Sequence, residues 1–177
     1  NYTASLDVQA AIGQGNTVVS PIQLATYAAT LANNGTRYRT HFVKAILDTN
    51  TGEVLSETKP EVMDVIEGTG NTFELVRQGM KQVPSTISGK ISSYPVPIAC
   101  KTGTPQRSET YASGKHYLNA IMVAYLPADD PQIAISLVVE KGGSGSTLAS
   151  IAADILRYYF SAEESREETL TENTLIR

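Results

Sequence analysis

Residues 117–139 read YLNAIMVAYLPADDPQIAISLVV, two apolar runs separated by a stretch of prolines and aspartates. The runs 117–126 and 132–139 are rich in β-branched and aromatic residues, which favour strands. Residues 127–131 (PADDP) form a strong turn signal, and so short a connection makes the two strands antiparallel. Residues 98–104 (IACKTGT) predict a third strand. Because 132–139 is nearly all apolar, we expect both of its faces to be covered.

Helical signals flank these strands on both sides in the sequence. Ser20 suits an N-cap, Pro21 suits the first helical position and Gly35 suits the stop, which predicts a helix between them. Residues 72–83 and 147–160 carry apolar side chains at helical spacing. Strands in antiparallel order with helices around them indicate the α+β class, an antiparallel sheet covered by helices.

The remaining stretches are a predicted hairpin, a glycine-rich loop and a polar tail. Residues 42–48 (FVKAILD) and 53–57 (EVLSE) predict two strands joined by a turn at Asn50-Thr51-Gly52. The GGSGS stretch at 142–146 predicts a flexible loop. Residues 161–177 carry five glutamates and few large apolar residues, so we expect a disordered acidic tail after a domain portion at 1–160.

The composition excludes several kinds of protein. The net charge is −4, so no general basic surface argues for nucleic-acid binding. No apolar run approaches the roughly 20 residues that span a bilayer. Cys100 is the only cysteine, which rules out an internal disulfide, and its apolar strand indicates a buried packing role. His41 and His116 are isolated and make no zinc-binding pattern, so no metal is expected.

Lys101-Thr102-Gly103-Thr104 is the motif best suited to binding an anionic peptide. An ammonium and two hydroxyls on one strand can meet a carboxylate through charge-assisted hydrogen bonds. Glycine removes a side chain where a ligand backbone has to approach closely. An exposed edge strand could then accept an extended peptide as an added strand. Pro105 favours extended geometry at Thr104 and ends the ladder beyond it.

Two ordered segments resemble one family. AIGQG (11–15) and VSPIQLA (19–25) resemble the GQG…TP-x-Q-x-A stretch of class B penicillin-binding proteins. KTGTPQ (101–106) resembles the KTGTAQ box of that family, with Pro105 where alanine is usual. The resemblance covers about residues 8–160 and is closest to the penicillin-binding-protein-2-like branch. It implies a partial penicillin-binding/β-lactamase-like transpeptidase fold.

The resemblance also implies a function for the parent protein. Family members are serine-type peptidoglycan D,D-transpeptidases, in which a serine attacks the penultimate D-Ala carbonyl of a stem peptide and β-lactams trap the acyl-enzyme. The implied partners are D-Ala-D-Ala stem peptides, β-lactams, the upstream part of the same domain and a membrane glycosyltransferase of the elongation machinery. No cofactor is implied. The parent is expected at the extracytoplasmic face of the bacterial cytoplasmic membrane, anchored by an upstream transmembrane helix.

Site residues carry over only where the motif matches. Lys101 would add positive potential near the nucleophile, and the Thr104 backbone N–H would be one half of the oxyanion hole, so these two are the expected catalytic residues. Thr102, Gly103 and Thr104 would bind substrate, through two hydroxyls and one close backbone approach. The glycines and Gln14 of the GQG segment are expected to shape a turn near the site.

The family's nucleophile motif, S-x-x-K, is not convincingly present. Ser56 and Lys59 match the spacing, but Pro60 follows and a hairpin precedes, which indicates the end of a surface strand. Residues 117–119 (YLN) mimic the second box, S-x-N, yet they follow Lys101 instead of preceding it. We therefore expect a C-terminal fragment that lacks the serine, is inactive alone and tends to self-associate.

Three other interpretations stay open at this stage. A D,D-carboxypeptidase or β-lactamase relative would carry the same K-T-G motif. A β-lactam-sensing domain on the same scaffold would need the same upstream serine. An unrelated extracellular module with a chance KTGT predicts that residues 98–139 do not form a contiguous antiparallel sheet.

Overall fold

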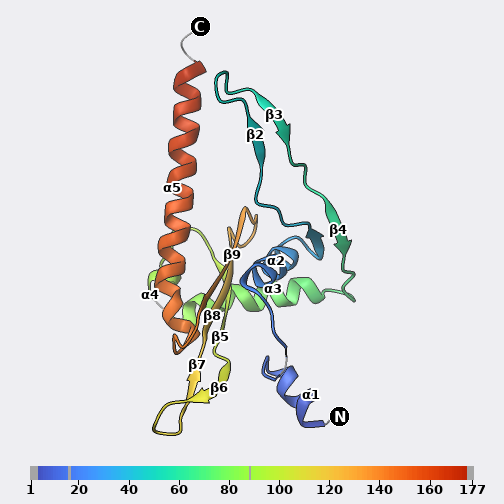
Figure 1. Cartoon of the computed structure of the whole chain (residues 1–177), viewed down its shortest axis with the longest axis vertical. Coiled ribbons are helices and arrows are strands. Elements are labelled where there is room, and N and C mark those ends of the chain that lie inside the picture. Colours follow the sequence, from blue (N-terminus) through green and yellow to red (C-terminus); the bar gives the residue numbers. More distant parts are fainter. Residues whose placement is uncertain (1–3, 16, 88, 175–177) are drawn as a thin grey trace.

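A three-stranded antiparallel sheet forms the centre of the protein (Figure 1). The computed structural model describes residues 4–15, 17–87 and 89–174. The strand order is β5 (Ala99–Gly103), β8 (Ala120–Leu126) and β9 (Ile133–Val139), with β8 in the middle. The three predicted strands and their antiparallel pairing are confirmed, and the sheet is contiguous, which contradicts the interpretation of a chance motif in an unrelated module.

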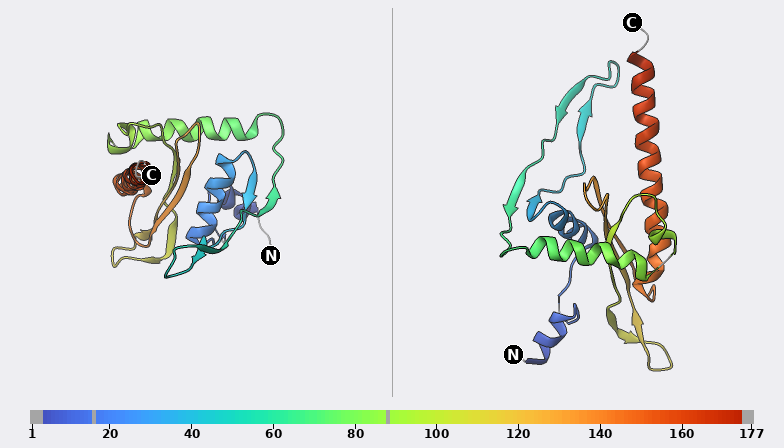
Figure 2. Two further views of the ribbon diagram at one scale, coloured as in Figure 1. Left: turned by 90° about the horizontal axis from the view of Figure 1, so that it is seen from above. Right: turned by 180° about the vertical axis from the view of Figure 1, so that it is seen from behind.

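Helices cover both faces of this sheet, as the apolar pattern predicted. On one face, α5 (Ala149–Thr174) packs through Ala152 and Leu156 against Cys100 and Met122. On the other, α2 (Pro21–Ala32) and α3 (Thr72–Gln82) enclose a second core around Tyr125. Viewed from above, the sheet separates α5 from α2 (Figure 2). Strand β9 contributes to both cores, although it stays partly exposed at the edge.

Local signals set the start of α2. The Ser20 side chain accepts from the Gln23 backbone N–H, and the Gln23 side chain accepts from the Ser20 N–H at 2.8 Å, which completes a capping box. Pro21 occupies the first turn, as predicted. Gly35 follows the helix at φ +95°, a conformation that favours glycine. The capping box and Pro21 therefore fix where this helix begins.

Two short ribbons of strands extend from the core. Strands β2 (Ala45–Leu47) and β3 (Val54–Glu57) form the predicted hairpin, with shorter strands than the sequence indicated. Strands β1 (Thr36–Tyr38) and β4 (Val62–Val65) pair antiparallel nearer to α2, and the sequence analysis missed this pair. Together they make a long arm on one side of the molecule (Figure 1). Strands β1 and β4 are short and far apart in the sequence, and no turn signal joins them directly as Asn50-Thr51-Gly52 joins β2 and β3.

Several predicted segments differ in the structure. The run 117–126 is broken at Asn119, because β7 (His116–Leu118) leaves the central sheet to pair with β6 (Gln106–Thr110). Short helices replace part of the loop predicted at 84–97, namely η1 (Val83–Thr86) and α4 (Gly89–Ser92). An N-terminal helix, α1 (Ala4–Ala11), was not anticipated.

The C-terminal helix is longer than predicted. Helix α5 begins at Ala149, after the 3-10 turn η2 (Gly145–Leu148), and continues to Thr174. The backbone of residues 161–174, which we expected to be disordered, is therefore helical. Glutamate, arginine and alanine are good helix formers, so a helix already anchored by its first turns propagates through this stretch. The domain boundary at residue 160 stays a prediction. None of the helices in the described part of the chain has the combination of length and hydropathy that a membrane span requires.

Candidate functional site

Lys101, Thr102 and Gly103 lie on the outer strand of the sheet. Strand β5 pairs with β8 alone, with Lys101 opposite Val123 and Gly103 opposite Ile121. Within the described residues, the second edge of β5 is unpaired. An unpaired edge presents backbone donors and acceptors that can bind an extended peptide. The motif thus occupies the position that the peptide-binding hypothesis requires.

The strand distributes its side chains over two environments. Ala99 packs in the core beside α2, whereas Cys100 packs in the core beside α5. Strand alternation places Lys101 on the α2 face and Thr102 on the α5 face. The exposed Lys101 ammonium donates a hydrogen bond of 2.8 Å to the Thr102 carbonyl oxygen, which holds the ammonium close to its own strand.

An apolar groove of about 370 Å³ lies beside Lys101. Its walls come from α2, α3 and the sheet, and its other lining residues are Tyr27, Leu31, Val76, Gly79, Met80, Val83 and Val123. Lys101 is the only charged residue of this lining. A cation beside an apolar wall keeps more of its electrostatic influence than one in open water, because the local dielectric constant is lower.

Thr104 lies just beyond the end of β5 and is held by the glycine-rich loop. The backbone N–H of Gly145 donates a hydrogen bond of 3.0 Å to Thr104 Oγ1. Gly145 is buried, whereas Thr104 is exposed. The loop predicted to be flexible is therefore ordered, because it runs into η2 and packs on the sheet. The sequence analysis missed Gly145 because spacing alone did not distinguish it from the neighbouring glycines.

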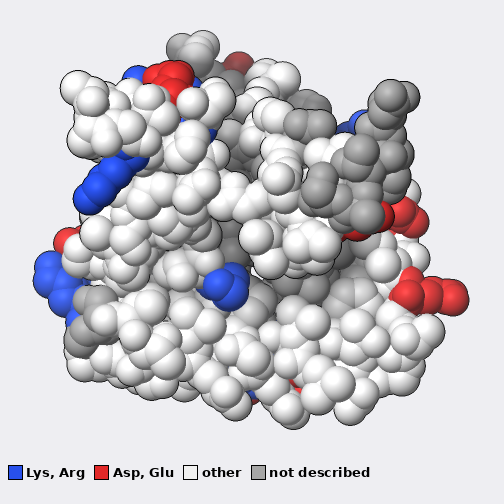
Figure 3. All heavy atoms as spheres, turned by 90° about the horizontal axis from the view of Figure 1, so that it is seen from below, with Lys and Arg blue, Asp and Glu red and all other residues white. Residues whose placement is uncertain are grey.

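The two recognised motifs meet in space. Oε1 of Gln14, from the GQG segment, accepts a hydrogen bond of 3.3 Å from the backbone N–H of Gln106. A cleft of about 680 Å³ opens between these segments, with Gln9, Ile12 and Arg107 also in its lining. Seen from below, this end of the molecule is mostly uncharged, with one basic side chain near the centre (Figure 3). The GQG segment therefore lies next to the end of the Lys101–Thr104 strand.

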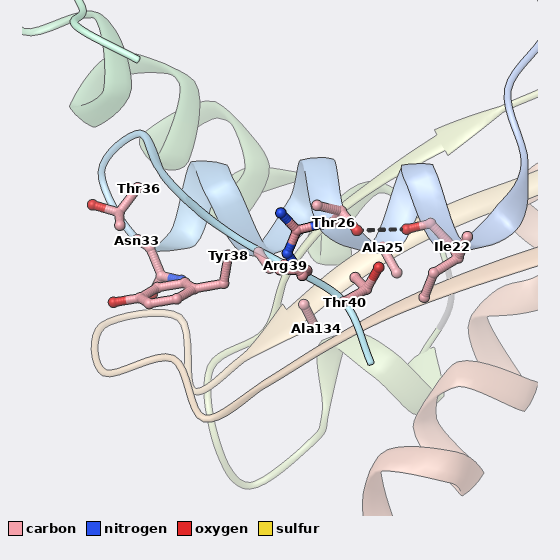
Figure 4. Close-up of a pocket in the computed structure, with 10 residues that line it drawn as sticks. Ile22, Ala25, Thr26, Asn33, Thr36, Tyr38, Arg39, Thr40 and Ala134 are labelled. Atoms are coloured by element: carbon pink, nitrogen blue, oxygen red, sulfur yellow. Dashed lines mark hydrogen bonds between the residues drawn. The ribbon is translucent and has the colours of Figure 1, made fainter. Parts of the chain in front are cut away.

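A third hollow, of about 240 Å³, lies away from the motif between α2, β1 and β9 (Figure 4). Ile22 and Ala25 supply apolar walls, and Thr26 Oγ1 donates to the Ile22 carbonyl at 2.8 Å. Arg39 at its rim makes a two-point pair with Glu61, at 2.7 and 3.0 Å, which raises the pKa of Arg39 and lowers that of Glu61. The Arg39 charge and the Thr26 hydroxyl thus already have partners, and no predicted site residue lines this cavity.

Cys100 has the packing role that the sequence indicated. Its side chain is fully buried, and burial raises the pKa of the thiol to about 12. Only the thiolate is a good nucleophile, so this cysteine is inert in the folded protein. Throughout the described part of the chain, no group of three histidine, cysteine or acidic residues could hold a metal ion.

The two formal matches to catalytic boxes have structural roles. Ser56 lies on the exposed strand β3, and Lys59, beyond the end of that strand, forms an ion pair with Glu57. Tyr117 packs against Tyr111, with ring centroids 3.8 Å apart. Asn119 Oδ1 accepts a hydrogen bond of 3.0 Å from the backbone N–H of Lys141. Neither match lies at the start of a helix, and neither faces the groove beside Lys101.

Comparison with known proteins gives the same fold and family. Residues 2–157 match the penicillin binding protein transpeptidase domain. Penicillin-binding protein 2A of Bacillus subtilis is 32% identical over 180 residues, covering 92% of this chain and 25% of that protein. Peptidoglycan D,D-transpeptidase MrdA of Acinetobacter baumannii is 30% identical, and the match covers 86% of this chain and 24% of that protein. The structure of penicillin-binding protein 2B from Streptococcus pneumoniae superposes with a TM-score of 0.77 at 30% identity. The superposition covers 92% of this chain and 28% of that protein.

The fold and the motif thus define a penicillin-binding, α+β transpeptidase architecture of which this sheet is a part. The chain belongs to the penicillin binding protein transpeptidase domain family, and its relatives include proteins of the penicillin-binding-protein-2 type, as the sequence resemblance indicated. It spans about a quarter of the length of the curated relatives it matches.

Proposed function

We propose that this chain is part of a peptidoglycan D,D-transpeptidase, and that it supplies the edge strand that binds the D-Ala-D-Ala end of a stem peptide. The observation that carries the proposal is the position of Lys101–Gly103 on the open edge of β5, with Thr104 at its end. Family membership and the name of the Acinetobacter relative support the same reaction.

The proposed reaction follows the chemistry of an activated serine. The serine oxygen bonds to the carbonyl carbon of the penultimate D-Ala, the peptide C–N bond breaks, and D-alanine leaves after its amine gains a proton. An amine of a second stem peptide then displaces the serine and forms the cross-link. A β-lactam opens by the same attack, but its leaving nitrogen stays tethered, so the acyl-enzyme persists.

Each residue of the motif has a role in this proposal. The backbone N–H of Thr104 supplies one half of an oxyanion hole, and the serine's own N–H supplies the other. Lys101 adds positive potential beside the nucleophile. The Thr102 and Thr104 hydroxyls donate to the terminal carboxylate, and Gly103 lets the peptide backbone approach.

The serine itself would come from another part of the same domain. The apolar groove beside Lys101 supports this assignment, because an apolar wall with one cation at its rim suits a packed helix that carries a polar nucleophile. Exposed apolar side chains such as Tyr27 and Val76 along this wall are the residues such a helix would bury.

We further place the parent protein at the outer face of the bacterial cytoplasmic membrane, with a membrane glycosyltransferase of the elongation machinery as a partner. Peptidoglycan stem peptides are found at that face, so the proposed substrate requires this location. The identity of the partner rests on the likeness to penicillin-binding-protein-2-type relatives.

The test compares the full-length protein with this chain alone. A fluorescent penicillin should label the full-length protein on one serine outside residues 1–177, identified by peptide mass analysis. The chain expressed alone should stay unlabelled. A label on any serine within the chain would refute the assignment of the nucleophile, and an unlabelled, folded full-length protein would refute the function.

A further inference from the structure

We infer that Gly145 is a positioning residue for Thr104: its backbone N–H fixes the Thr104 hydroxyl so that this hydroxyl donates to the substrate carboxylate. The inference rests on the proposed function. It assigns a role to the glycine-rich loop at 142–146, which lies outside the KTGT motif. Three observations carry it: the hydrogen bond, the close packing of Gly145, and the anchoring of the loop.

The hydrogen bond restricts the directions open to the hydroxyl proton, because the position facing the Gly145 N–H is taken. A threonine hydroxyl has one proton to donate and two lone pairs to accept with. Thr104 Oγ1 accepts from Gly145 N–H at 3.0 Å, in a partly buried setting. Its O–H therefore remains available to a ligand at the exposed end of the strand. Without this anchor the hydroxyl could rotate, and donation to the carboxylate would lose its orientation.

The close packing explains why residue 145 is glycine. A Cβ added there would lie 2.5 Å from the Ile121 carbonyl oxygen, 3.0 Å from the Gly103 nitrogen and closer still to the Gly103 carbonyl oxygen. All three atoms are backbone atoms of β5 and β8, so they cannot move aside as a flexible side chain could. Any larger residue would push the loop away from Thr104 or displace the end of the strand.

The loop is anchored on both sides of Gly145. The Gly143 N–H donates to the Leu118 carbonyl at 3.1 Å, just before β8 begins. On the other side, Leu148 and Ala149 are buried in the core at the start of α5. Ser144 caps η2 by accepting from the Ser146 N–H. The donor at Gly145 is thus held in place before any ligand arrives, which is what a preorganised site requires.

The first test measures how well the site discriminates in favour of a carboxylate. Acylation rate constants are measured with benzylpenicillin and with its methyl ester, using the full-length protein. For Gly145→Ala, the acid-to-ester ratio should fall by about tenfold, the value expected for one misplaced hydrogen bond to a charged group. Thr104→Val should lower the ratio similarly. Gly52→Ala is the control: Gly52 lies in the β2–β3 turn, away from β5, and nothing lies within 4 Å of its added Cβ, so the ratio should stay unchanged.

The outcomes separate the possible explanations. Equal losses with acid and ester in Gly145→Ala would show a general structural role and overturn the inference, as would an unchanged ratio. If Gly145→Ala does not fold, hydrogen exchange decides: the Gly145 amide should exchange faster in Thr104→Val, while the Gly143 amide is unaffected. If the Gly145 amide exchanged at the same rate in the wild type and in Thr104→Val, the inference would be overturned. A wild-type protein that benzylpenicillin does not acylate would refute the proposed function, whereas the exchange result would still test the hydrogen bond.

Discussion

The backbone N–H of Gln106 donates a hydrogen bond to Oε1 of Gln14, although 92 residues separate them. Gln14 belongs to the GQG segment, and Gln106 is the last residue of KTGTPQ. The two stretches that resembled the family separately are therefore neighbours at one end of the sheet. Both groups are exposed, so the bond contributes to local order more than to overall stability.

The role of Lys101 can be tested by removing its charge. In the full-length protein, Lys101→Ala should lower the second-order rate constant of acylation by penicillin by more than about tenfold, because the ammonium stabilises negative charge beside the nucleophile. Lys90→Ala is the matched control. Lys90 lies on α4, away from β5, and its ammonium pairs with Asp154 at 3.6 Å. Unchanged acylation in Lys101→Ala would remove this residue from the site.

The buried thiol of Cys100 should make the free energy of unfolding depend on pH. The thiol pKa is about 12 in the fold, against 9.0 as its ordinary value. Between these values the unfolded chain has lost the thiol proton and the folded protein has kept it, so the free energy of unfolding falls as pH rises. Below pH 9 the contribution is fully present. Cys100→Ala should lack this component, so the difference between wild type and variant in urea titrations should shrink from pH 9 upward, by at most about 1.4 kcal/mol per pH unit. A constant difference would contradict the buried thiol.

Gly35, in the α2–β1 turn, should tolerate alanine less well than Gly52, in the β2–β3 turn. A Cβ there would lie 2.8 Å from Phe73 Cζ and closer still to the Ile66 carbonyl oxygen, at φ +95°. Gly52 also has positive φ, at +74°, but nothing lies within 4 Å of its added Cβ. Both alanine variants suffer the backbone cost of about 1–2 kcal/mol. Gly35→Ala should lose about 1–3 kcal/mol more through overpacking, measured by chemical denaturation. Equal losses would mean that the turn relaxes freely.

The chain alone should self-associate. Its arm exposes apolar side chains on both strands of the hairpin, including Ile46 at 55% and Leu55 at 63%. Apolar area of this kind favours association in water. Size-exclusion chromatography with light scattering should give a mass that rises with concentration, and an Ile46→Lys/Leu55→Lys variant should lower it. A monomer at every concentration would show that the arm stays in solvent.

Local patterns determined most of the elements. Ser20 and Pro21 define the start of α2 through capping and φ restriction, which depend on neighbours in the sequence. The turn at 127–131 fixes an antiparallel pair, because so few residues cannot cross a sheet. The strands and helices of the core followed from these signals, and the KTGT motif marked the candidate site in advance.

Only the tertiary structure decided how the elements meet. That β5 is an edge strand, that Gln14 lies against Gln106, and that Gly145 supports Thr104 all depend on contacts between distant parts of the chain. The short strands β1 and β4 form because pairing across the fold outweighs weak local preference. Local sequence carries dihedral preferences and apolar spacing, whereas burial and long-range hydrogen bonds arise once the chain has packed.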